Sequence, residues 1–377
     1  MPCLNEAETL GRCVEKARRA MAAAGIAGEV VVADNGSTDG SIGIAGAAGA
    51  RVVHVAERGY GNALMAGIAA ARGQFVLMGD ADDSYDFLEV SRFVEPLRAG
   101  FDLVQGCRLP VGGGTVAPGA MPFLHRWWGN PMFSAIARWW YRAPIHDIYC
   151  GMRAFKRPLI ESLDLRCTGM EFALEMIIKA TMNGARIAEV PITLRPDGRT
   201  VHPPHLRTFR DGWRSLRFFL VYSPRWLFLI PGILLGLAGL ACYLLVYGGL
   251  GIGPLRFDAH TLLFGSLAII CGFQSILFAV MTKVFAINEG LLPMDRRIER
   301  AFQILDLERG LVLAGLTMLA GLVLLGAAIG QWFDAGLGHL DYARTMRWVI
   351  PGVTLTTLGF QATLSGFFLS ILGLRRK

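Results

Sequence analysis

The stretch QFVLMGDADD, residues 74–83, decides the fold of the N-terminal half of this chain. Its apolar run at residues 75–78 predicts a buried strand, and an acidic turn follows that strand directly. Carboxylates two residues apart in an extended segment point the same way, so we expect Asp80 and Asp82 to share one face. Such a pair offers the oxygen ligands that Mg²⁺ or Mn²⁺ prefers, usually completed by substrate phosphates. A solvated acidic turn is the plainer interpretation, because this pattern is common by chance.

Strands and helices alternate on both sides of this stretch. Strands are predicted at residues 29–33, 51–55, 74–78, 103–107 and 186–191, and helices at residues 59–71 and 89–99. Such alternation predicts a mostly parallel sheet whose ligands bind at the carboxyl ends of the strands. Asp34 and Asp80 both follow strands, so we expect them to line one crevice. An Asx turn explains Asp34 equally well, since a Gly-Ser-Thr turn comes after it.

Four long uncharged stretches dominate the C-terminal half, at residues 226–247, 261–282, 310–333 and 348–374. Each reaches the roughly 20 residues that a helix needs to cross the hydrocarbon core of a bilayer. Buried helices of a soluble protein would show an amphipathic stripe instead. We therefore predict an all-α transmembrane domain with four spans.

The net charge of +7 is concentrated beside these predicted spans. Basic residues gather between the second and third spans and in the C-terminal tail: Lys283, Arg296, Arg297, Arg300, Arg309, Arg375, Arg376 and Lys377. The positive-inside rule then places the middle loop, both termini and the polar domain on the cytoplasmic side of the membrane. We expect that membrane to be a cell inner membrane or its equivalent. Charge beside membrane segments is poor evidence for nucleic acid, so we expect no such partner. Seven cysteines without a C-x-x-C pair fit a reduced compartment.

The segment that joins the two halves is basic and amphipathic. Arginines at 207, 210, 214 and 217 fall on one helical face of residues 206–220, beside a face of Leu, Phe and Trp. This pattern predicts an interfacial helix, and a surface helix packed on its own domain is the alternative. The predicted organisation is a catalytic domain at residues 1–205, the interfacial helix at 206–225 and the transmembrane domain at 226–377.

Two further features shape the expectations for the N-terminal domain. Residues 2–6, with Pro2, Asn5 and Glu6, form a pattern that normally follows a first strand, so we expect the sheet to lack that strand. His202 and His205 could suggest a metal pair. They have no carboxylate or Cys close by in sequence, so we interpret them as surface residues.

Several motifs, in order, resemble a known family. Residues 2–6, 33–41 and 80–82 resemble the GT-A glycosyltransferases of family 2. Residues 147–153, 171–175 and 189–192 are similar to the branch that acts on polyprenyl phosphates, which contains dolichyl- and undecaprenyl-phosphate glucose and mannose synthases. The resemblance covers roughly residues 1–225. It implies an α/β GT-A domain and inverting transfer of a hexose from a nucleotide sugar to a polyprenyl phosphate.

The resemblance also implies roles for individual residues. Pro2, Asn5, Glu6 and Asp34 would hold the nucleoside, Asp80 and Asp82 would handle the metal and the diphosphate in catalysis, and Arg108, Arg126 and Arg153 would meet the lipid phosphate. Glu175 would be an acid/base or orienting residue, and the alternative is that it only caps a polar site on a helix rich in Leu, Met and Ile. The acidic run continues as Asp83-Ser84-Tyr85 where many relatives have Leu-Gln, which puts the sugar contacts in doubt. The Gln-x-x-Arg-Trp motif of processive members is absent, which argues against a polysaccharide polymerase.

UDP-glucose is the expected donor and GDP-mannose the alternative. A phosphate monoester has a second pKa near 6, so the acceptor oxygen is already anionic at neutral pH and needs cations more than a base. Transfer to a lipid without phosphate is the rival enzyme interpretation, and a transport helper with a degenerate transferase domain is the non-enzyme one. Spans without charged residues argue against transport. A homo-oligomer is compatible with all of these interpretations.

Overall fold

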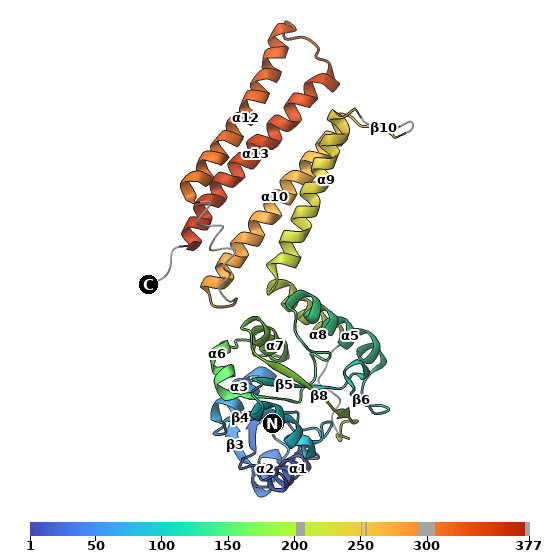
Figure 1. Cartoon of the computed structure of the whole chain (residues 1–377), viewed down its shortest axis with the longest axis vertical. Helices are drawn as coiled ribbons and strands as arrows, with labels where there is room; N and C mark the ends of the chain where they lie inside the picture. Colours follow the sequence, from blue (N-terminus) through green and yellow to red (C-terminus); the bar gives the residue numbers. More distant parts are fainter. Residues whose placement is uncertain (201–207, 250, 253–254, 293–305, 374–377) are drawn as a thin grey trace. The chain divides into compact units, whose positions relative to one another are not determined.

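The computed structural model describes residues 1–200, 208–249, 251–252, 255–292 and 306–373 (Figure 1). The chain forms two compact units, Met1–Phe219 and Leu220–Lys377. His202, His205 and Arg207 lie outside the described residues, and so do the predicted cytoplasmic arginines at 296, 297 and 300.

The first unit is built on two sheets that share one hydrophobic core. One sheet has the order β1 (Pro2–Cys3), β2 (Val31–Asp34) and β3 (Arg51–His54), and all its pairs are parallel. The other has the order β4 (Phe75–Met78), β7 (Arg153–Lys156), β5 (Leu103–Cys107) and β8 (Ile187–Pro191). Here β5 and β8 are parallel, whereas β7 runs antiparallel to β4 and β5. A small parallel pair, β6 (Thr115–Val116) and β9 (Thr193–Leu194), completes the strands of this unit. The predicted α/β class with a mostly parallel sheet is confirmed.

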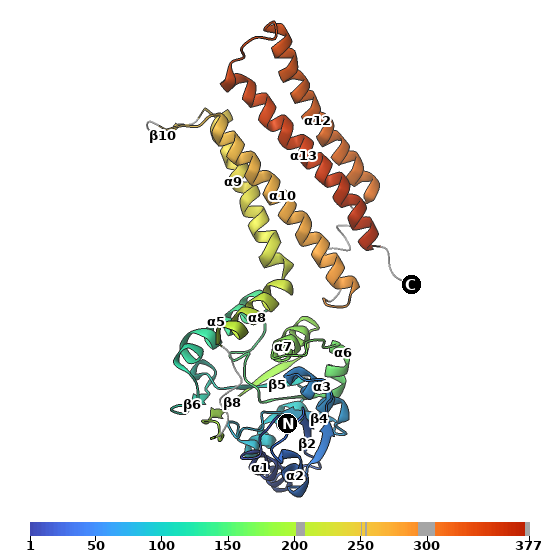
Figure 2. The ribbon, with the colours of Figure 1, turned by 180° about the vertical axis from the view of Figure 1, so that it is seen from behind.

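Helices cover both sheets of this unit (Figures 1 and 2). They are α1 (Leu10–Ala23), α2 (Ser41–Ala47), α3 (Tyr60–Ala70), α4 (Val90–Arg98), α5 (Asn130–Ile136), α6 (Arg157–Leu163), α7 (Phe172–Met182) and α8 (Thr208–Val221). Helix α1 buries Leu10, Cys13, Val14 and Ala17 and exposes its charged side, as the spacing of an amphipathic helix requires. Helix α7 is buried from Phe172 to Ala180, which makes it the inner helix of the unit.

The expectation of a missing first strand concerns the residues at the start of the given sequence, and it stays a prediction. Pro2 and Cys3 do not lie in a turn after a strand but form β1 itself, paired in parallel with Ala33 and Asp34. The amino group of Met1 extends this pairing by donating to the carbonyl oxygen of Val31 at 2.9 Å. Strand β1 is two residues long in the given sequence.

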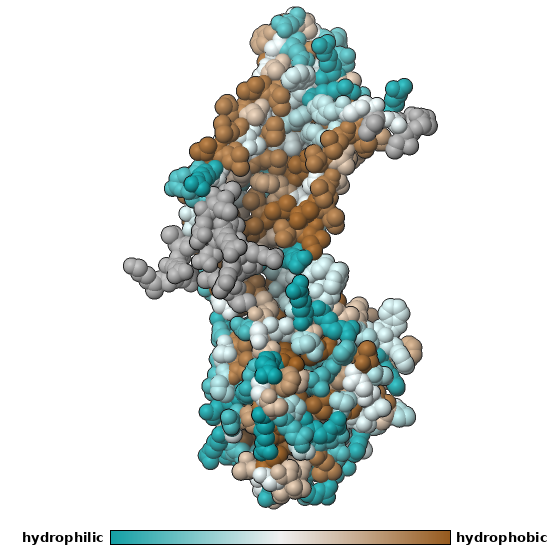
Figure 3. Space-filling view, viewed as in Figure 1, coloured by the Kyte–Doolittle hydropathy of each residue, from teal (hydrophilic) through white to brown (hydrophobic). Residues whose placement is uncertain are grey.

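The second unit contains α9 (Ile230–Tyr247), α10 (Ala259–Asn288), α12 (Leu307–Asp334) and α13 (Tyr342–Gly373), with a short hairpin of β10 (Gly251–Ile252) and β11 (Leu255–Arg256). Four helices of the described chain are long and apolar enough to cross a membrane, as predicted. Brown, hydrophobic side chains gather on them in Figure 3. Glycines let the helices approach closely: a Cβ on Gly239 would lie 2.5 Å from the carbonyl oxygen of Gly265.

Helix α8 presents the predicted apolar face to the outside of its unit. Phe209 and Trp213 are 86% and 62% exposed. The residues that anchor the helix are Phe218 and Phe219, both buried, and Phe219 stacks on Phe133 of α5 with ring centroids 5.9 Å apart. The part of the predicted apolar face that carries Phe209 and Trp213 is thus not used for packing within the unit.

Candidate active site

Asp80 and Asp82 lie in the acidic turn directly after β4, where the sequence pattern placed them. One oxygen of Asp80 accepts a hydrogen bond from the hydroxyl of Tyr60, the first residue of α3, at 2.8 Å. One oxygen of Asp82 accepts from both the backbone N–H and the hydroxyl of Ser84, at 3.1 and 2.6 Å. Each carboxylate is therefore held through one oxygen by a neutral donor.

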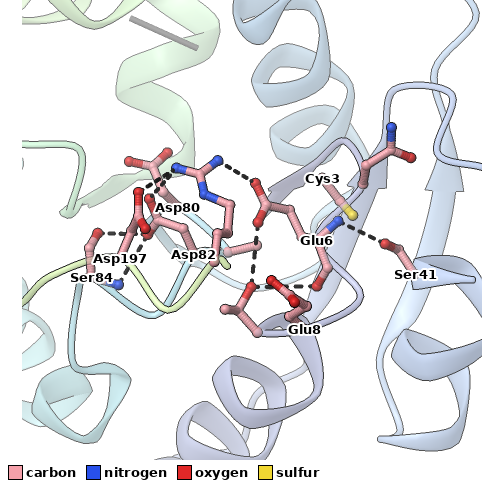
Figure 4. Close-up of polar contacts among 12 residues, drawn as sticks. Cys3, Glu6, Glu8, Ser41, Asp80, Asp82, Ser84 and Asp197 are labelled. Atoms are coloured by element: carbon pink, nitrogen blue, oxygen red, sulfur yellow. Dashed lines mark hydrogen bonds and ion pairs between the residues drawn. The ribbon is translucent and has the colours of Figure 1, made fainter. Parts of the chain in front are cut away.

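A single guanidinium joins this turn to the residues after β1. Arg199 lies 3.0 Å from Glu6 and 3.2 Å from Asp82 and from Asp197. Figure 4 shows these carboxylates, Glu6, Asp82 and Asp197, converging with Asp80 close by. The segment that carries Arg199 is fastened to the turn, because the N–H of Gly198 donates to the carbonyl oxygen of Asp82 at 2.8 Å. We call Glu6, Asp80, Asp82 and Asp197 the carboxylate cluster.

The carboxylate cluster carries more negative charge than its one guanidinium offsets. Burial, then repulsion by Asp82, raises the pKa of Asp80 to about 6. Burial also raises the pKa of Glu6 to about 7, although Arg199 acts in the opposite direction. Carboxyl groups held together in this way favour either a proton or a bound cation. The cluster is thus an electrostatically incomplete site.

The donor atoms of the cluster fit a divalent metal ion. In the described part of the chain, no group of three or more His, Cys, Asp and Glu side chains is arranged to hold a metal by itself. Mg²⁺ and Mn²⁺ sites of enzymes that handle phosphates are built differently, from one or two carboxylates and oxygens of the substrate. Asp80 and Asp82 supply such a pair. Gly151 packs closely against this pair, because a Cβ added at Gly151 would lie only 2.6 Å from an oxygen of Asp80.

The predicted nucleoside residues gather at the carboxyl ends of β1 and β2. The carboxylate of Asp34 is buried and accepts from the N–H groups of Gly36 and Ser37 at 3.2 Å, so the Asx-turn interpretation also holds. Asn5 has a left-handed backbone with φ of 57° and accepts from the N–H of Thr38 at 2.8 Å. The loops after the two strands are therefore bound to each other beside Glu6.

Arg108 is already engaged by a carboxylate. Its Nε and Nη2 donate to Asp147 at 2.7 and 2.9 Å, and its backbone N–H donates to the same side chain. Glu189 holds the neighbouring loop, because it accepts from the N–H groups of His146 and Asp147 and pairs with the His146 ring at 2.7 Å. The ion pair with Asp147 occupies the Nε and Nη2 side of the Arg108 guanidinium. The role of Arg108 toward a lipid phosphate stays a prediction.

Arg153 and Glu175 are placed where they serve the fold. Arg153 has no exposed surface, and its guanidinium donates to the carbonyl oxygens of Ala173, Ile148 and Cys150. Glu175 is fully buried, accepts from the N–H groups of residues 166 and 167, and pairs with Lys179 at 2.9 Å. We therefore correct the expectation that Arg153 meets a lipid phosphate and that Glu175 acts as an acid or base.

Arg126 lies in a different environment, on an aromatic surface. It belongs to a π-helical turn, His125–Gly129, just before α5, and its guanidinium lies 5.3 Å from the centre of the Trp127 ring. Trp127, Trp128 and Trp139 are 57%, 70% and 68% exposed. Helix α5 packs on α8 through Phe133 and Phe219, so these tryptophans and the open face of α8 belong to neighbouring helices.

Sequence reasoning missed Arg199, Asp197 and Tyr60. Arg199 lies more than a hundred residues from the turn that it contacts, and the Arg-Pro-Asp-Gly-Arg segment around it reads as an ordinary loop. Tyr60 lies between Gly59 and Gly61 at the start of a predicted helix. This position between two glycines was the only feature of the sequence that could have marked Tyr60 as a site residue.

The chain matches known proteins in both units. Residues 1–164 match the model of glycosyl transferase family 2, and residues 280–373 match the model of the glycosyltransferase family 2 C-terminal transmembrane region. The chain is 36% identical to the low-salt glycan biosynthesis hexosyltransferase of Haloferax volcanii, over 99% of this chain and 88% of that protein. It is 37% identical to a dolichyl-phosphate hexose transferase of the same organism, over 44% of this chain and 70% of that protein. It is 34% identical to the polyprenol monophosphomannose synthase of Mycolicibacterium smegmatis, over 51% and 75%. The chain therefore belongs to glycosyltransferase family 2, as an enzyme with a GT-A catalytic unit and a membrane-spanning C-terminal unit.

Proposed function

We propose that this glycosyltransferase moves a hexose from a nucleotide sugar to a polyprenyl phosphate at the cytoplasmic face of the membrane. The observation that carries the proposal is the carboxylate cluster after β1 and β4, whose negative charge exceeds the single positive charge of Arg199. Relatives named as a dolichyl-phosphate hexose transferase and a polyprenol monophosphomannose synthase support the acceptor class. The Lys and Arg residues between the second and third spans support the orientation.

The donor would lie along the carboxyl ends of β1, β2 and β4. Pro2, Asn5, Glu6 and Asp34 would contact the nucleoside, as ligands do at the carboxyl edge of an α/β sheet. UDP-glucose is our first choice of donor. GDP-mannose is the alternative, and the mannose synthase among the relatives keeps it open.

The diphosphate would complete the carboxylate cluster. Mg²⁺ or Mn²⁺ held by Asp80 and Asp82 would neutralise the leaving nucleoside diphosphate. Arg199 lies within 3.2 Å of Asp82, so a modest side-chain rotation would let it share its guanidinium between this carboxylate and a phosphate oxygen. Tyr60 orients Asp80 by occupying one of its two oxygens.

The acceptor would approach from the aromatic surface of the first unit. Trp127, Trp128, Trp139 and the open face of α8 have the amphipathic character of side chains that lie at a bilayer surface. Arg126 lies among them, and its Nε is buried with no hydrogen-bond partner in the described residues. This side chain is available for an anionic headgroup, which makes it our preferred contact for the lipid phosphate.

The chemistry requires a positioned nucleophile more than a strong base. An oxygen of the lipid phosphate attacks the anomeric carbon, the bond from that carbon to the diphosphate oxygen breaks, and the configuration inverts. Because the second pKa of a phosphate monoester is near 6, the attacking oxygen is anionic at neutral pH. This agrees with the structural role found for Glu175, since no other base is needed.

The test is a product assay with purified full-length protein, Mn²⁺, a panel of nucleotide sugars and polyprenyl phosphate, read by mass spectrometry. The proposal predicts a polyprenyl-phosphate hexose with one donor of the panel, and no product from Asp82→Asn. Glu161→Gln is the matched control, because Glu161 is an exposed carboxylate paired with Arg157 on α6. Product on diacylglycerol but not on polyprenyl phosphate would overturn the acceptor assignment.

A further inference from the structure

The turn that carries Tyr60 is built around two glycines. Gly59 has a φ of 146°, and Gly61 follows Tyr60 as the second residue of α3. A Cβ on Gly59 would lie 2.5 Å from the carbonyl oxygen of Thr168. A Cβ on Gly61 would lie 2.4 Å from the carbonyl oxygen of Cys167. The backbone of residues 167 and 168 therefore packs directly against the two residues that flank Tyr60.

The same distant segment caps helix α3. The N-cap residue, Gly59, has no side chain that could accept a hydrogen bond from the first N–H groups of the helix. The carbonyl oxygen of Thr168 accepts these bonds instead, from the N–H groups of Gly61 at 2.9 Å and Asn62 at 3.4 Å. The position of this segment thus sets where α3 begins.

A buried ion pair on α7 holds the segment in place. Glu175 has no exposed surface, and its Oε2 accepts from the N–H groups of Arg166 at 2.9 Å and Cys167 at 2.8 Å. Its Oε1 lies 2.9 Å from Nζ of Lys179, which in turn donates to the carbonyl oxygen of Asp164 at 2.6 Å. The carboxylate and the ammonium group thus bind the backbone of residues 164–167 through charge-assisted hydrogen bonds, which are short and strong.

We infer that Glu175 is a positioning residue for the proposed metal site. It holds the backbone next to residues 167 and 168, and these residues cap α3. Helix α3 begins with Tyr60 and places its hydroxyl on Asp80 at 2.8 Å. The inference rests on the proposed function, in which Asp80 and Asp82 bind Mg²⁺ or Mn²⁺. Partners that orient a metal ligand without touching the metal typically contribute tenfold to a hundredfold to metal affinity.

Stability alone gives little reason for a charged pair in this helix. Every residue of α7 from Phe172 to Ala180 is buried. Replacing a buried ion pair by apolar residues of similar volume is often neutral or stabilising. Apolar side chains could fill the positions of Glu175 and Lys179, but they could not bind the backbone of residues 164–167. The hydrogen bonds to this segment therefore distinguish the pair from ordinary packing.

The test replaces the whole pair in the full chain by apolar residues, Glu175→Leu together with Lys179→Met. The Tm should stay close to that of the wild type, because no unpaired charge remains. Affinity for Mn²⁺ in the presence of UDP, measured by electron paramagnetic resonance, should fall about tenfold to a hundredfold, because the cap of α3 loses its anchor. A folded variant with the Mn²⁺ affinity of the wild type would overturn the inference.

Tyr60→Phe shows whether the pair acts through the hydroxyl of Tyr60. Alone, this change should weaken Mn²⁺ binding by a similar factor. Added to the apolar pair it should cause little further loss, because both changes remove the same hydrogen bond to Asp80. Losses that multiply would show independent roles and would overturn the inference. A wild type that does not bind Mn²⁺ at all would contradict the proposed metal site itself, and this role of Glu175 with it.

Gly61→Ala is a second test that leaves the buried pair intact. The added Cβ would press on the carbonyl oxygen of Cys167. We expect Mn²⁺ affinity to fall about tenfold, and the amide of Asn62 to exchange its hydrogen about tenfold faster without any metal present. Gly46→Ala is the matched control, because a Cβ at this position of α2 meets open space. If Gly61→Ala kept the Mn²⁺ affinity of Gly46→Ala, the inference would be overturned.

Discussion

Two groups of charged residues in the first unit differ in their charge balance. The carboxylate cluster sets Glu6, Asp80, Asp82 and Asp197 against the single guanidinium of Arg199. The buried pairs, Arg108 with Asp147 and Glu175 with Lys179, match one cation with one anion. We call these the balanced pairs.

This difference separates a site from a scaffold. Each balanced pair is closed by hydrogen bonds from nearby backbone groups, so it holds a loop or helix in place and has little need of a ligand. In the carboxylate cluster, burial first and then repulsion between carboxylates raise the pKa values of Asp80 and Glu6. A bound cation would relieve this repulsion, and for this reason we assign catalysis to the cluster and structure to the pairs.

The largest expected effect comes from Asp82→Asn. Loss of a metal ligand removes several kcal/mol of charge stabilisation, so kcat should fall on the order of a thousandfold. The Tm should stay level or rise, because one source of repulsion is removed. Steady-state kinetics and thermal unfolding of the same preparation check both halves of this prediction. A large loss of Tm would mean that the cluster is a scaffold as well.

Asp147→Asn should give the opposite pattern. It leaves the buried guanidinium of Arg108 without its carboxylate, which typically destabilises a protein by about 3–5 kcal/mol. Chemical unfolding should show this loss, while donor affinity of the folded fraction stays unchanged. Asp102→Asn is the control, because its pair with Lys156 is about one-third exposed and should change stability by about 1 kcal/mol or less. Similar losses for the two variants would remove the distinction that we draw.

Arg199→Gln should act on the donor. Charge-assisted hydrogen bonds contribute about 1.5–3 kcal/mol, so the KM for the nucleotide sugar should rise about tenfold to a hundredfold. The acceptor KM should not change. Arg195→Gln is the matched control, since Arg195 lies in the same segment but pairs with Asp86 and is half exposed. An effect on the acceptor alone would show that Arg199 faces the lipid.

The pH dependence should have opposite signs for binding and for stability. A divalent cation needs ionised carboxylates, so its affinity should fall as the pH drops through about 6, the raised pKa of Asp80, by up to about tenfold per pH unit. Between pH 4.5 and about 7 the folded state holds more protons at Glu6 than the unfolded chain does. The contribution of Glu6 to stability therefore falls as the pH rises through this range. Isothermal titration with Mn²⁺ and thermal unfolding from pH 5 to 8 measure the two trends.

Local patterns in the sequence were sufficient for the elements and for part of the site. The apolar run before Asp80 predicted β4 and its acidic turn, and the uncharged stretches predicted the four long helices, because both signals depend on neighbouring residues. The strand before Asp34 was also predicted within two residues.

Partners distant in the chain could not be predicted. The sequence does not show that Arg108 pairs with Asp147, or that the guanidinium of Arg153 donates to backbone carbonyl oxygens. Arg199 contacts Glu6, which lies 193 positions earlier in the sequence. The spacing of apolar residues along the chain does not predict such a contact. Charge balance is a property of such contacts, so it becomes visible only in the folded chain.

The most direct test of the account is a Mn²⁺ titration of the full-length protein, followed by electron paramagnetic resonance with and without UDP. We predict that UDP and Mn²⁺ strengthen each other's binding in the wild type and in Asp147→Asn, and that Asp82→Asn binds UDP without any effect of Mn²⁺. If Asp82→Asn retained the mutual strengthening, the carboxylate cluster would not be the cation site, and the central claim would be contradicted.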